Sequence, residues 1–319
     1  MLRGLALASM FVAHCAPDDG PFRLAALTEF ATAPLFALLI GVGAALADRG
    51  NAGLPVAFVR AGVRAAVLVA VGLWVEPWGA QVDIVLVYLA LPTLLAPLLA
   101  RLPVTVLLGL ATTSWAAAPV LLSWGRTHST QALVVGDDVG HRLWDIVLAG
   151  EHYRLTTLIV FTCLGIVLWR WTSTVPAWSA AVAGLLTLAG AALLMAAKTS
   201  GRLAFEPYDG SHLEIVLEAL LVGGFALAWF ALVPERLRLP ALAAAGSMTL
   251  SVYVLQIAYL AWYTRDLHPG ERDDSWSNVV VLCVGALVLP MLWRSLVSRE
   301  PWSRGPLEGP TAAVTHLVR

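Results

Sequence analysis

Charged residues are scarce in this chain: Asp, Glu, Lys and Arg make up 13% of its 319 residues. A soluble globular domain carries about 25%. Hydrophobic residues reach 59%, and the mean hydropathy is +0.78. The formal net charge of −1 offers no strongly basic surface of the kind that binds nucleic acid. The composition therefore excludes an ordinary soluble domain and argues against a nucleic-acid partner.

Cysteine is also scarce, with only Cys15, Cys163 and Cys283. An odd number of cysteines in apolar surroundings is typical of small buried residues rather than of a disulfide framework. No group of His, Cys and Asp has the spacing of a zinc site. The sequence thus predicts neither a disulfide nor a metal.

Long apolar runs dominate instead, and most are long enough to cross about 30 Å of hydrocarbon at about 1.5 Å per residue. Such runs must be helices, because lipid offers no partner to the backbone, and they lack the alternation of β-barrel strands. We expect one all-α, polytopic transmembrane bundle over residues 1–319. The predicted spans number about ten: 2–15, 27–47, 56–75, 83–100, 103–123, 153–172, 177–197, 212–233, 241–262 and 277–297.

The charges divide unevenly between the two alternating sets of loops and span ends. One set holds twelve arginines and four acids, a net charge of +8, and the other holds eight basic and seventeen acidic residues, a net charge of −9. Short Arg-rich loops stay cytoplasmic during insertion. We therefore expect both termini in the cytoplasm, and the acids and nearly all histidines toward the outer side.

The first span, 2–15, is short and opens almost at Met1 without a signal-peptide n-region. We expect the true chain to begin upstream of Met1. Three longer loops are expected outside, at 124–152, 198–211 and 263–276. Within the first, residues 141–148 have apolar positions at helical spacing and are predicted to lie along the interface.

The strongest candidate for chemistry is Arg3 with His14. Eleven residues make three helical turns, so both side chains share one face about 16 Å apart along the axis. Ionisable groups inside a span usually serve a pathway or a site, and a histidine can act as a general base. The alternative is an interfacial arginine with a histidine that caps the helix end.

A second candidate is a polar stripe in the span 241–262, where Thr249, Tyr253 and Gln256 fall at i, i+4 and i+7. Such a stripe either bonds neighbouring helices or lines a cavity.

The third candidate lies at the start of the span 212–233. Ser211 and Glu214 form a capping-box pattern, and an acid at a helix N-terminus is favoured by the dipole. Glu218, one turn deeper, has no such explanation. A proton-relay or substrate role for Glu218 or His212 competes with a structural role.

Glu29, Asp83 and Tyr88 lie near outer span ends, where each could point into an outward cavity or sit at the interface. Gly41-Val42-Gly43 lies inside an apolar run, so close helix packing is a better interpretation than a phosphate loop.

These residues carry a resemblance. Leu2-Arg3-Gly4-Leu5-Ala6 followed by His14 is similar to the first-span signature of the transmembrane acyltransferase superfamily. The chain more closely resembles bacterial proteins of the heparan-alpha-glucosaminide N-acetyltransferase-like or YeiB-like type. The other matching stretches, in order, are Ala33–Phe36 with Gly41–Gly43, Val82–Tyr88, Gly150–Tyr153 with Gly165 and Arg170, Gly246–Tyr253 with Gln256, and Arg304–Glu308.

The chain departs from that pattern twice. The acidic residue that usually precedes Leu-Arg-Gly is absent, and the usual Tyr-Pro reads Tyr153-Arg154. The segment around Arg154 is therefore expected to lose its usual turn.

The resemblance implies transfer of an acyl group, with acetyl as the expected group, from cytoplasmic acyl-CoA to an extracytoplasmic glycan or lipid-linked sugar. His14 would be the base or transient acyl carrier and Arg3 would orient the donor, at a bacterial plasma membrane with lipids as neighbours. Acceptor-side or channel-lining residues would be Glu29, Asp83, Tyr88, His212, Glu214, Glu218, Thr249, Tyr253 and Gln256. A secondary transporter of a small solute, or a non-catalytic membrane partner, are the rival interpretations.

Overall fold

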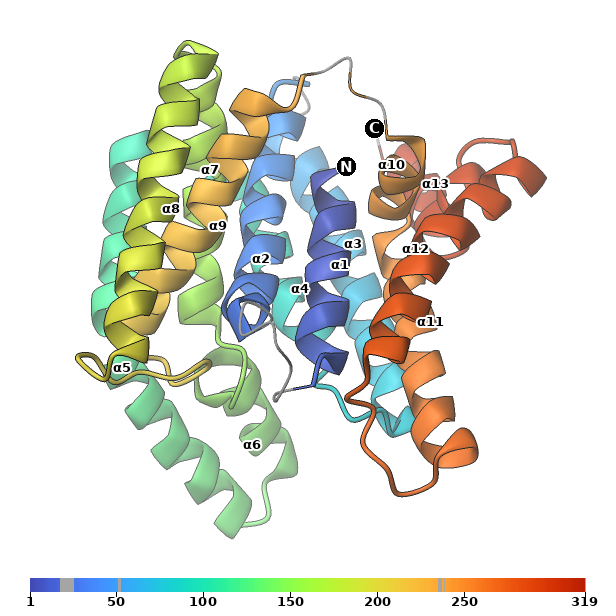
Figure 1. The fold of residues 1–319 in the computed structure, drawn as a ribbon, viewed down its shortest axis with the longest axis horizontal. Helices are drawn as coiled ribbons and strands as arrows, with labels where there is room; N and C mark the ends of the chain where they lie inside the picture. The colour runs from blue at the N-terminus through green and yellow to red at the C-terminus, as the bar shows by residue number, and fades with distance from the viewer. Residues whose placement is uncertain (18–25, 51–52, 235–236, 238, 319) are drawn as a thin grey trace. The chain divides into compact units, whose positions relative to one another are not determined.

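A computed structural model of the chain describes residues 1–17, 26–50, 53–234, 237 and 239–318. Within these residues the chain forms helices joined by short connections, with no β-strand. The all-α prediction is confirmed. Figure 1 shows the helices in chain order from blue to red.

Most of the helices coincide closely with the apolar runs predicted from the sequence. Their bounds are α1 Leu2–Cys15, α2 Ala26–Asp48, α3 Leu54–Val75, α4 Leu86–Leu99, α5 Val104–Val134, α6 Asp138–Trp144, α7 Leu155–Thr172, α8 Ala177–Thr199, α9 His212–Leu232, α10 Pro240–Ser247, α11 Thr249–Trp262, α12 Trp276–Leu296 and α13 Glu308–Leu317. All three cysteines are free.

Seven of the described helices are long and apolar enough to cross a membrane, as expected of a multi-pass membrane protein. Helices α10 and α11 meet the same test only as a bent pair, and α1 and α4 are apolar but have 14 residues each. The predicted number of about ten spans stays a prediction.

The prediction was wrong about the end of the fifth span. Helix α5 continues from Val104 to Val134 instead of ending at residue 123. The first part of the predicted loop 124–152 is therefore helical, and α6 follows after a short turn. The helix predicted at 141–148 exists as the end of α6 and a π-helical turn, Asp145–Ala149.

The prediction was also wrong about residues 241–262, which do not form one straight span. Helix α10 ends at Ser247, α11 begins at Thr249, and their axes differ by 83°. Apolar periodicity continues across the break, so hydropathy alone did not reveal it. Sharp kinks have local causes, and here a carboxylate from the C-terminal segment holds the start of α11, as described below.

The chain divides into two compact units, each built from segments that are far apart in sequence. Unit 1 comprises the described residues of Met1–Thr32, Gly62–Leu86 and Glu235–Arg319, and unit 2 comprises Ala33–Ala61 and Val87–Pro234.

In unit 2, helices α2 and α7 cross at glycines. A Cβ on Gly41 would collide with the Thr162 carbonyl oxygen, and a Cβ on Gly165 would collide with the Leu38 carbonyl oxygen. Small residues allow such backbone contact where lipid supplies no hydrophobic drive between helices. The packing role predicted for Gly41 is confirmed.

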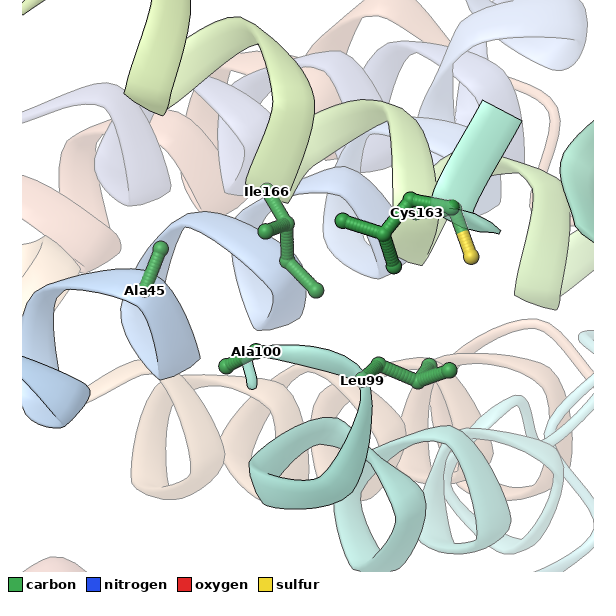
Figure 2. Packing of buried hydrophobic residues seen from close by; sticks show 6 residues of the cluster. Ala45, Leu99, Ala100, Cys163 and Ile166 are labelled. Atoms are coloured by element: carbon green, nitrogen blue, oxygen red, sulfur yellow. The ribbon is translucent and has the colours of Figure 1, made fainter. Parts of the chain in front are cut away.

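Beside this crossing lies a small buried core of unit 2. Figure 2 shows side chains of α2 and α7 facing the end of α4, with Ile166 and Cys163 on one side and Leu99 and Ala100 on the other. All of these are buried, as is Leu107 of α5. Helix α7 is thus fixed against α2, α4 and α5 by interlocking small and branched residues.

In unit 1, helix α1 packs its backbone against α10. A Cβ on Gly4 would lie 2.6 Å from the Leu242 carbonyl oxygen, and a Cβ on Gly246 would lie 3.0 Å from the amide nitrogen of Gly4. The two glycines let the start of α1, including Arg3, lie directly against the end of α10.

We predict that Gly165→Ala lowers the free energy of unfolding by about 1–3 kcal/mol, since the added methyl meets backbone that cannot rotate away. Gly109→Ala is the matched control, because a Cβ at Gly109 meets nothing within 4 Å. The control should be neutral or stabilising by up to about 1 kcal/mol through helix propensity. Thermal unfolding in detergent, followed by tryptophan fluorescence, measures both. Equal unfolding temperatures for the two variants would refute the backbone crossing.

Candidate functional site

Helix α1 carries Arg3 in its first turn and His14 in its last turn. Because both lie on one face, their side chains mark two ends of a line about 16 Å long. Arg3 is exposed and His14 is half-buried.

His14 is bound by Gln256 from α11, since the side-chain nitrogen of Gln256 lies 2.6 Å from Nδ1 of His14. The imidazole therefore faces the bundle and not lipid. The other amide atom of Gln256, Oε1, is buried with no hydrogen-bond partner among the described residues. The two ends of an amide differ little in size, so the opposite orientation fits the same space. In that orientation Oε1 accepts a hydrogen bond from Nδ1–H and the side-chain nitrogen takes the position without a partner, so the geometry allows either tautomer of His14.

Asp83 and Tyr253 join this pair. The Asp83 carboxylate, in the connection before α4, is exposed and interacts electrostatically with both His14 and Tyr253. Tyr253 is buried on α11, one turn before Gln256, and its hydroxyl has no hydrogen-bond partner among the described residues. Four residues singled out from the sequence, from three separate segments of unit 1, thus lie together.

The start of α11 is held by Glu308. Its carboxylate accepts hydrogen bonds from the amides of Leu250 at 2.7 Å and Ser251 at 3.0 Å, and a further short one from the Ser251 hydroxyl. The Ser251 hydroxyl oxygen also accepts from the amide of Leu307. These amides are the unpaired donors of a helix N-terminus, where negative charge is favoured. Glu308 therefore caps the half-helix that carries Tyr253 and Gln256.

Thr249, the first residue of the predicted polar stripe, faces this break. It begins α11, and its hydroxyl donates back to the carbonyl of Gly246. Its role is local to the turn.

Arginines gather at the other end of α1. Arg3 and Arg64, both exposed, are close enough to repel each other electrostatically. Arg294 of α12 donates to the Ser247 hydroxyl at 2.8 Å, next to the Gly246 backbone that Arg3 contacts. Arginine side chains grouped in this way favour binding of an anion such as phosphate.

At the His14 end of α1 lies a buried acid that the sequence analysis did not single out, Asp273. It is 2% exposed, its Oδ2 has no partner among the described residues, and it interacts electrostatically with Cys15. Burial raises the pKa of Asp273, and the neighbouring Asp274 raises that pKa further. Asn278 holds the segment, since its amide donates to the Asp273 carbonyl at 2.9 Å.

Unit 2 holds a second cluster, at the start of α9. Glu214 and Glu218 are 2% and 3% exposed, and both interact electrostatically with Arg154 and Asp209. Arg154, 3% exposed, donates to the carbonyl oxygens of Gly150 at 3.0 Å and Glu151 at 2.8 Å. It donates also to the Tyr208 carbonyl. The arginine side chain thereby closes the turn before α7 that was expected to be lost without proline.

The capping box predicted for Ser211 and Glu214 is half present. The Ser211 hydroxyl accepts from the Glu214 amide at 3.2 Å. The Glu214 carboxylate accepts a hydrogen bond from the Gly210 amide instead of from the Ser211 amide. The backbone at Gly210 is left-handed, with φ of 75°. Asp209 accepts from the amides of Ser211 and Glu206. Burial alone would raise the pKa of Asp209, but these hydrogen bonds hold it below its usual range.

Besides Arg3 and Thr249, three further predicted site residues lie outside these two clusters. His212 is exposed, and its ring contacts that of Trp115 with the ring centres 4.9 Å apart. Its Nε2 lies 3.2 Å from the Ala116 carbonyl oxygen, so it joins α9 to α5. Tyr88 contacts Tyr153 at 5.5 Å, and Tyr153 contacts Tyr208 at 6.0 Å. Glu29 is half-buried in the first turn of α2, and its sharing of a cavity with Asp83 and Tyr88 stays a prediction.

A Ser–His–Asp group was also missed, because its members come from α5, from α6 and from the π-helical turn after α6, across a predicted loop. The Ser129 hydroxyl lies 2.7 Å from Nδ1 of His141 and 2.6 Å from Oδ1 of Asp145. Ser129 is 4% exposed, and its hydroxyl is shared between both partners. The group is not arranged for nucleophilic attack and instead fastens α6 to α5.

Arg154, Asp209, Arg64 and Glu308 were also missed as site residues. Glu308 had been noted only within a matching stretch, and Arg154 only as a departure from Tyr-Pro, which was the available signal. Within the described ranges, no group of three or more His, Cys, Asp or Glu could hold a metal ion. Comparison of the chain with protein-family models, curated proteins and solved structures finds no match.

We predict that Glu308→Ala lowers the free energy of unfolding by at least about 2 kcal/mol, because it removes charge-assisted hydrogen bonds and leaves two helix amides without an acceptor. The matched control is Glu271→Ala, which removes an exposed carboxylate paired with His268 and should change stability little. Thermal unfolding in nanodiscs is the measurement. Identical unfolding temperatures for the two variants would contradict the capping role.

Proposed function

We propose that the protein is an integral membrane acyltransferase that passes an acyl group, in the first instance acetyl, from acyl-CoA to an extracytoplasmic hydroxyl or amine. The observation that carries the proposal is the contact of His14 with Gln256. It places an oriented imidazole at one end of α1 while a group of arginines occupies the other end. The likeness of several stretches to the transmembrane acyltransferase superfamily supports the same proposal.

The donor would lie along α1 with its phosphates at Arg3, Arg64 and Arg294. The pantetheine arm of CoA has about 13 bonds between phosphorus and sulfur, and an extended chain covers about 3.5 Å per three bonds. The arm is therefore about 15 Å long, which matches the separation of Arg3 and His14 along the helix. A thioester held in this way would end beside the imidazole.

His14 would take the proton of the acceptor. In the amide orientation in which Nδ1–H donates to Oε1 of Gln256, the lone pair of Nε2 is free to accept a proton from the attacking hydroxyl or amine. The acceptor atom then bonds to the thioester carbonyl carbon, the carbon–sulfur bond breaks, and the thiolate of CoA leaves and takes up the proton. Asp83 would stabilise the imidazolium that exists between these steps.

The acceptor would come from the outer side. Sorting the charges by the positive-inside rule puts the arginine end of α1 in the cytoplasm and the His14 end toward the exterior. Acyl-CoA is cytoplasmic, so this orientation suits a donor inside and an envelope glycan or lipid-linked sugar outside. The membrane is then the bacterial plasma membrane. Within unit 1, Glu29 and Asp273 are candidates for acceptor contact.

His14→Ala should lower the rate of acyl transfer by about 100-fold or more, because a positioned general base contributes about 10² to 10⁴. The measurement uses protein in nanodiscs with radiolabelled acetyl-CoA and solubilised envelope glycan or lipid-linked sugar. His128→Ala, which removes a half-buried imidazole of α5 in unit 2, is the control and should keep the full rate. Equal rates of acyl transfer by the two variants would show that His14 is not the general base.

The orientation has its own test. Alkaline phosphatase fused within the loop 198–211 should be active, and the same enzyme fused after residue 318 should be inactive, because only the periplasm allows it to fold. A green fluorescent protein fusion at each position should give the reverse pattern. An active phosphatase at the C-terminus would place the C-terminus outside and would contradict the proposed direction of acyl transfer.

A secondary transporter remains the second candidate, and the 83° break between α10 and α11 is the observation that favours it. Discontinuous helices often form substrate sites in transporters. Here, however, the amides at the start of α11 are occupied by Glu308 and not open to a substrate anion. Uptake of a small solute into proteoliposomes, together with no transfer from acetyl-CoA, would favour the carrier.

A further inference from the structure

Two carboxyl groups lie one above the other at the start of α9, in a helix long and apolar enough to cross a membrane. Glu218 follows Glu214 by four residues, which is about 6 Å along the axis on the same face. Oε2 of Glu218 has no hydrogen-bond partner among the described residues and no contact with solvent. A carboxyl oxygen in that position has neither water nor a donor to compensate a negative charge.

The charges around the pair do not balance without a further cation. On the elements packed against α9, the cations at this end are Arg154 before α7, Arg126 on α5 and Lys198 on α8. Lys198 is paired with Glu206 at 2.9 Å, and Arg126 is exposed and acts on Arg154. Arg154 is thus the one buried cation that faces the two buried acids in the described part of unit 2, and one negative charge is left over.

We propose that Glu214 and Glu218 together hold one exchangeable proton in unit 2, with Arg154 balancing the remaining charge. The proposal is independent of acyl transfer and gives this half of the chain a function of its own: it takes up and releases a proton inside the membrane domain. Intramembrane acids that face the protein interior commonly serve as proton sites.

A route to water exists through Asp209. Asp209 is exposed, precedes α9, and has its carboxylate fixed by the amides of Ser211 at 2.6 Å and Glu206 at 2.9 Å. Its side chain meets that of Glu214, and Glu214 interacts with Glu218. A proton passes from water to Asp209, then to Glu214 and Glu218, and returns by the same groups. No electron or other co-reactant is required.

Infrared spectroscopy of the resting protein in nanodiscs tests the proposal, because a protonated carboxyl group has a C=O stretch that a carboxylate lacks. We expect a band from one buried glutamic acid at neutral pH, which shifts in D₂O and is lost at high pH, and which its shift on ¹³C-glutamate labelling distinguishes from any band of the buried Asp273. Glu218→Gln and Glu214→Gln should each abolish the whole band, since the remaining acid then balances Arg154. Glu206→Gln, which removes a nearby exposed carboxylate, should leave the band intact.

A band that persists in both Gln variants, or that is missing from the wild-type protein, would overturn the proposal. If either variant fails to fold, the wild-type protein is measured instead with ¹³C-labelled glutamate. We expect the C=O band to move to lower frequency under this label. A band that does not move under this label overturns the proposal as well. If the wild-type protein shows no such band and is stabilised by Na⁺, the two glutamates bind a metal cation instead of a proton. That result would also contradict the proposal.

Discussion

The site in unit 1 depends on the carboxylate of Glu308 at the first turn of α11. In lipid an exposed helix end is costly, because its amides have no water to bond. A carboxylate supplies both the acceptor and the favoured charge, so the polypeptide can break between Ser247 and Thr249 without leaving those donors unpaired. Because of the break, α10 lies against the start of α1 while α11 contacts the end of α1. Gln256 consequently meets His14, and Gly246 meets Gly4.

Much of the architecture was predictable because lipid leaves few alternatives. Long apolar runs had to be helices, and the bounds of α7, α8, α9 and α12 lie within two residues of those expected. The continuation of α5 to Val134 was missed because Arg126, Thr127 and His128 look like a loop by hydropathy, although their backbone bonds are helical. The break at Met248 was missed because the residues on both sides are apolar, and the Glu308 carboxylate that caps the helix after it lies about 60 residues downstream in sequence.

The site residues divide in the same way. His14, Asp83, Tyr253 and Gln256 could be singled out because polar groups in apolar runs need a reason, and they lie together in unit 1. Glu214 and Glu218 were singled out likewise, but their partner Arg154 was not, because an arginine at a span end is ordinary in a sequence. Only the folded chain turns it inward to the carbonyls of Gly150 and Glu151. His212 lies apart because it follows the N-cap directly and points to α5.

The central claim is that Gln256 orients the His14 imidazole so that Nε2 is free to accept a proton. Nitrogen NMR of ¹⁵N-histidine-labelled protein in nanodiscs tests this directly, since the two ring nitrogens report which of them carries the proton. The account predicts that neutral His14 carries its proton on Nδ1, and that Gln256→Leu shifts both resonances and mixes the tautomers. A proton found on Nε2 in the resting protein, or His14 resonances that ignore the loss of Gln256, would contradict it.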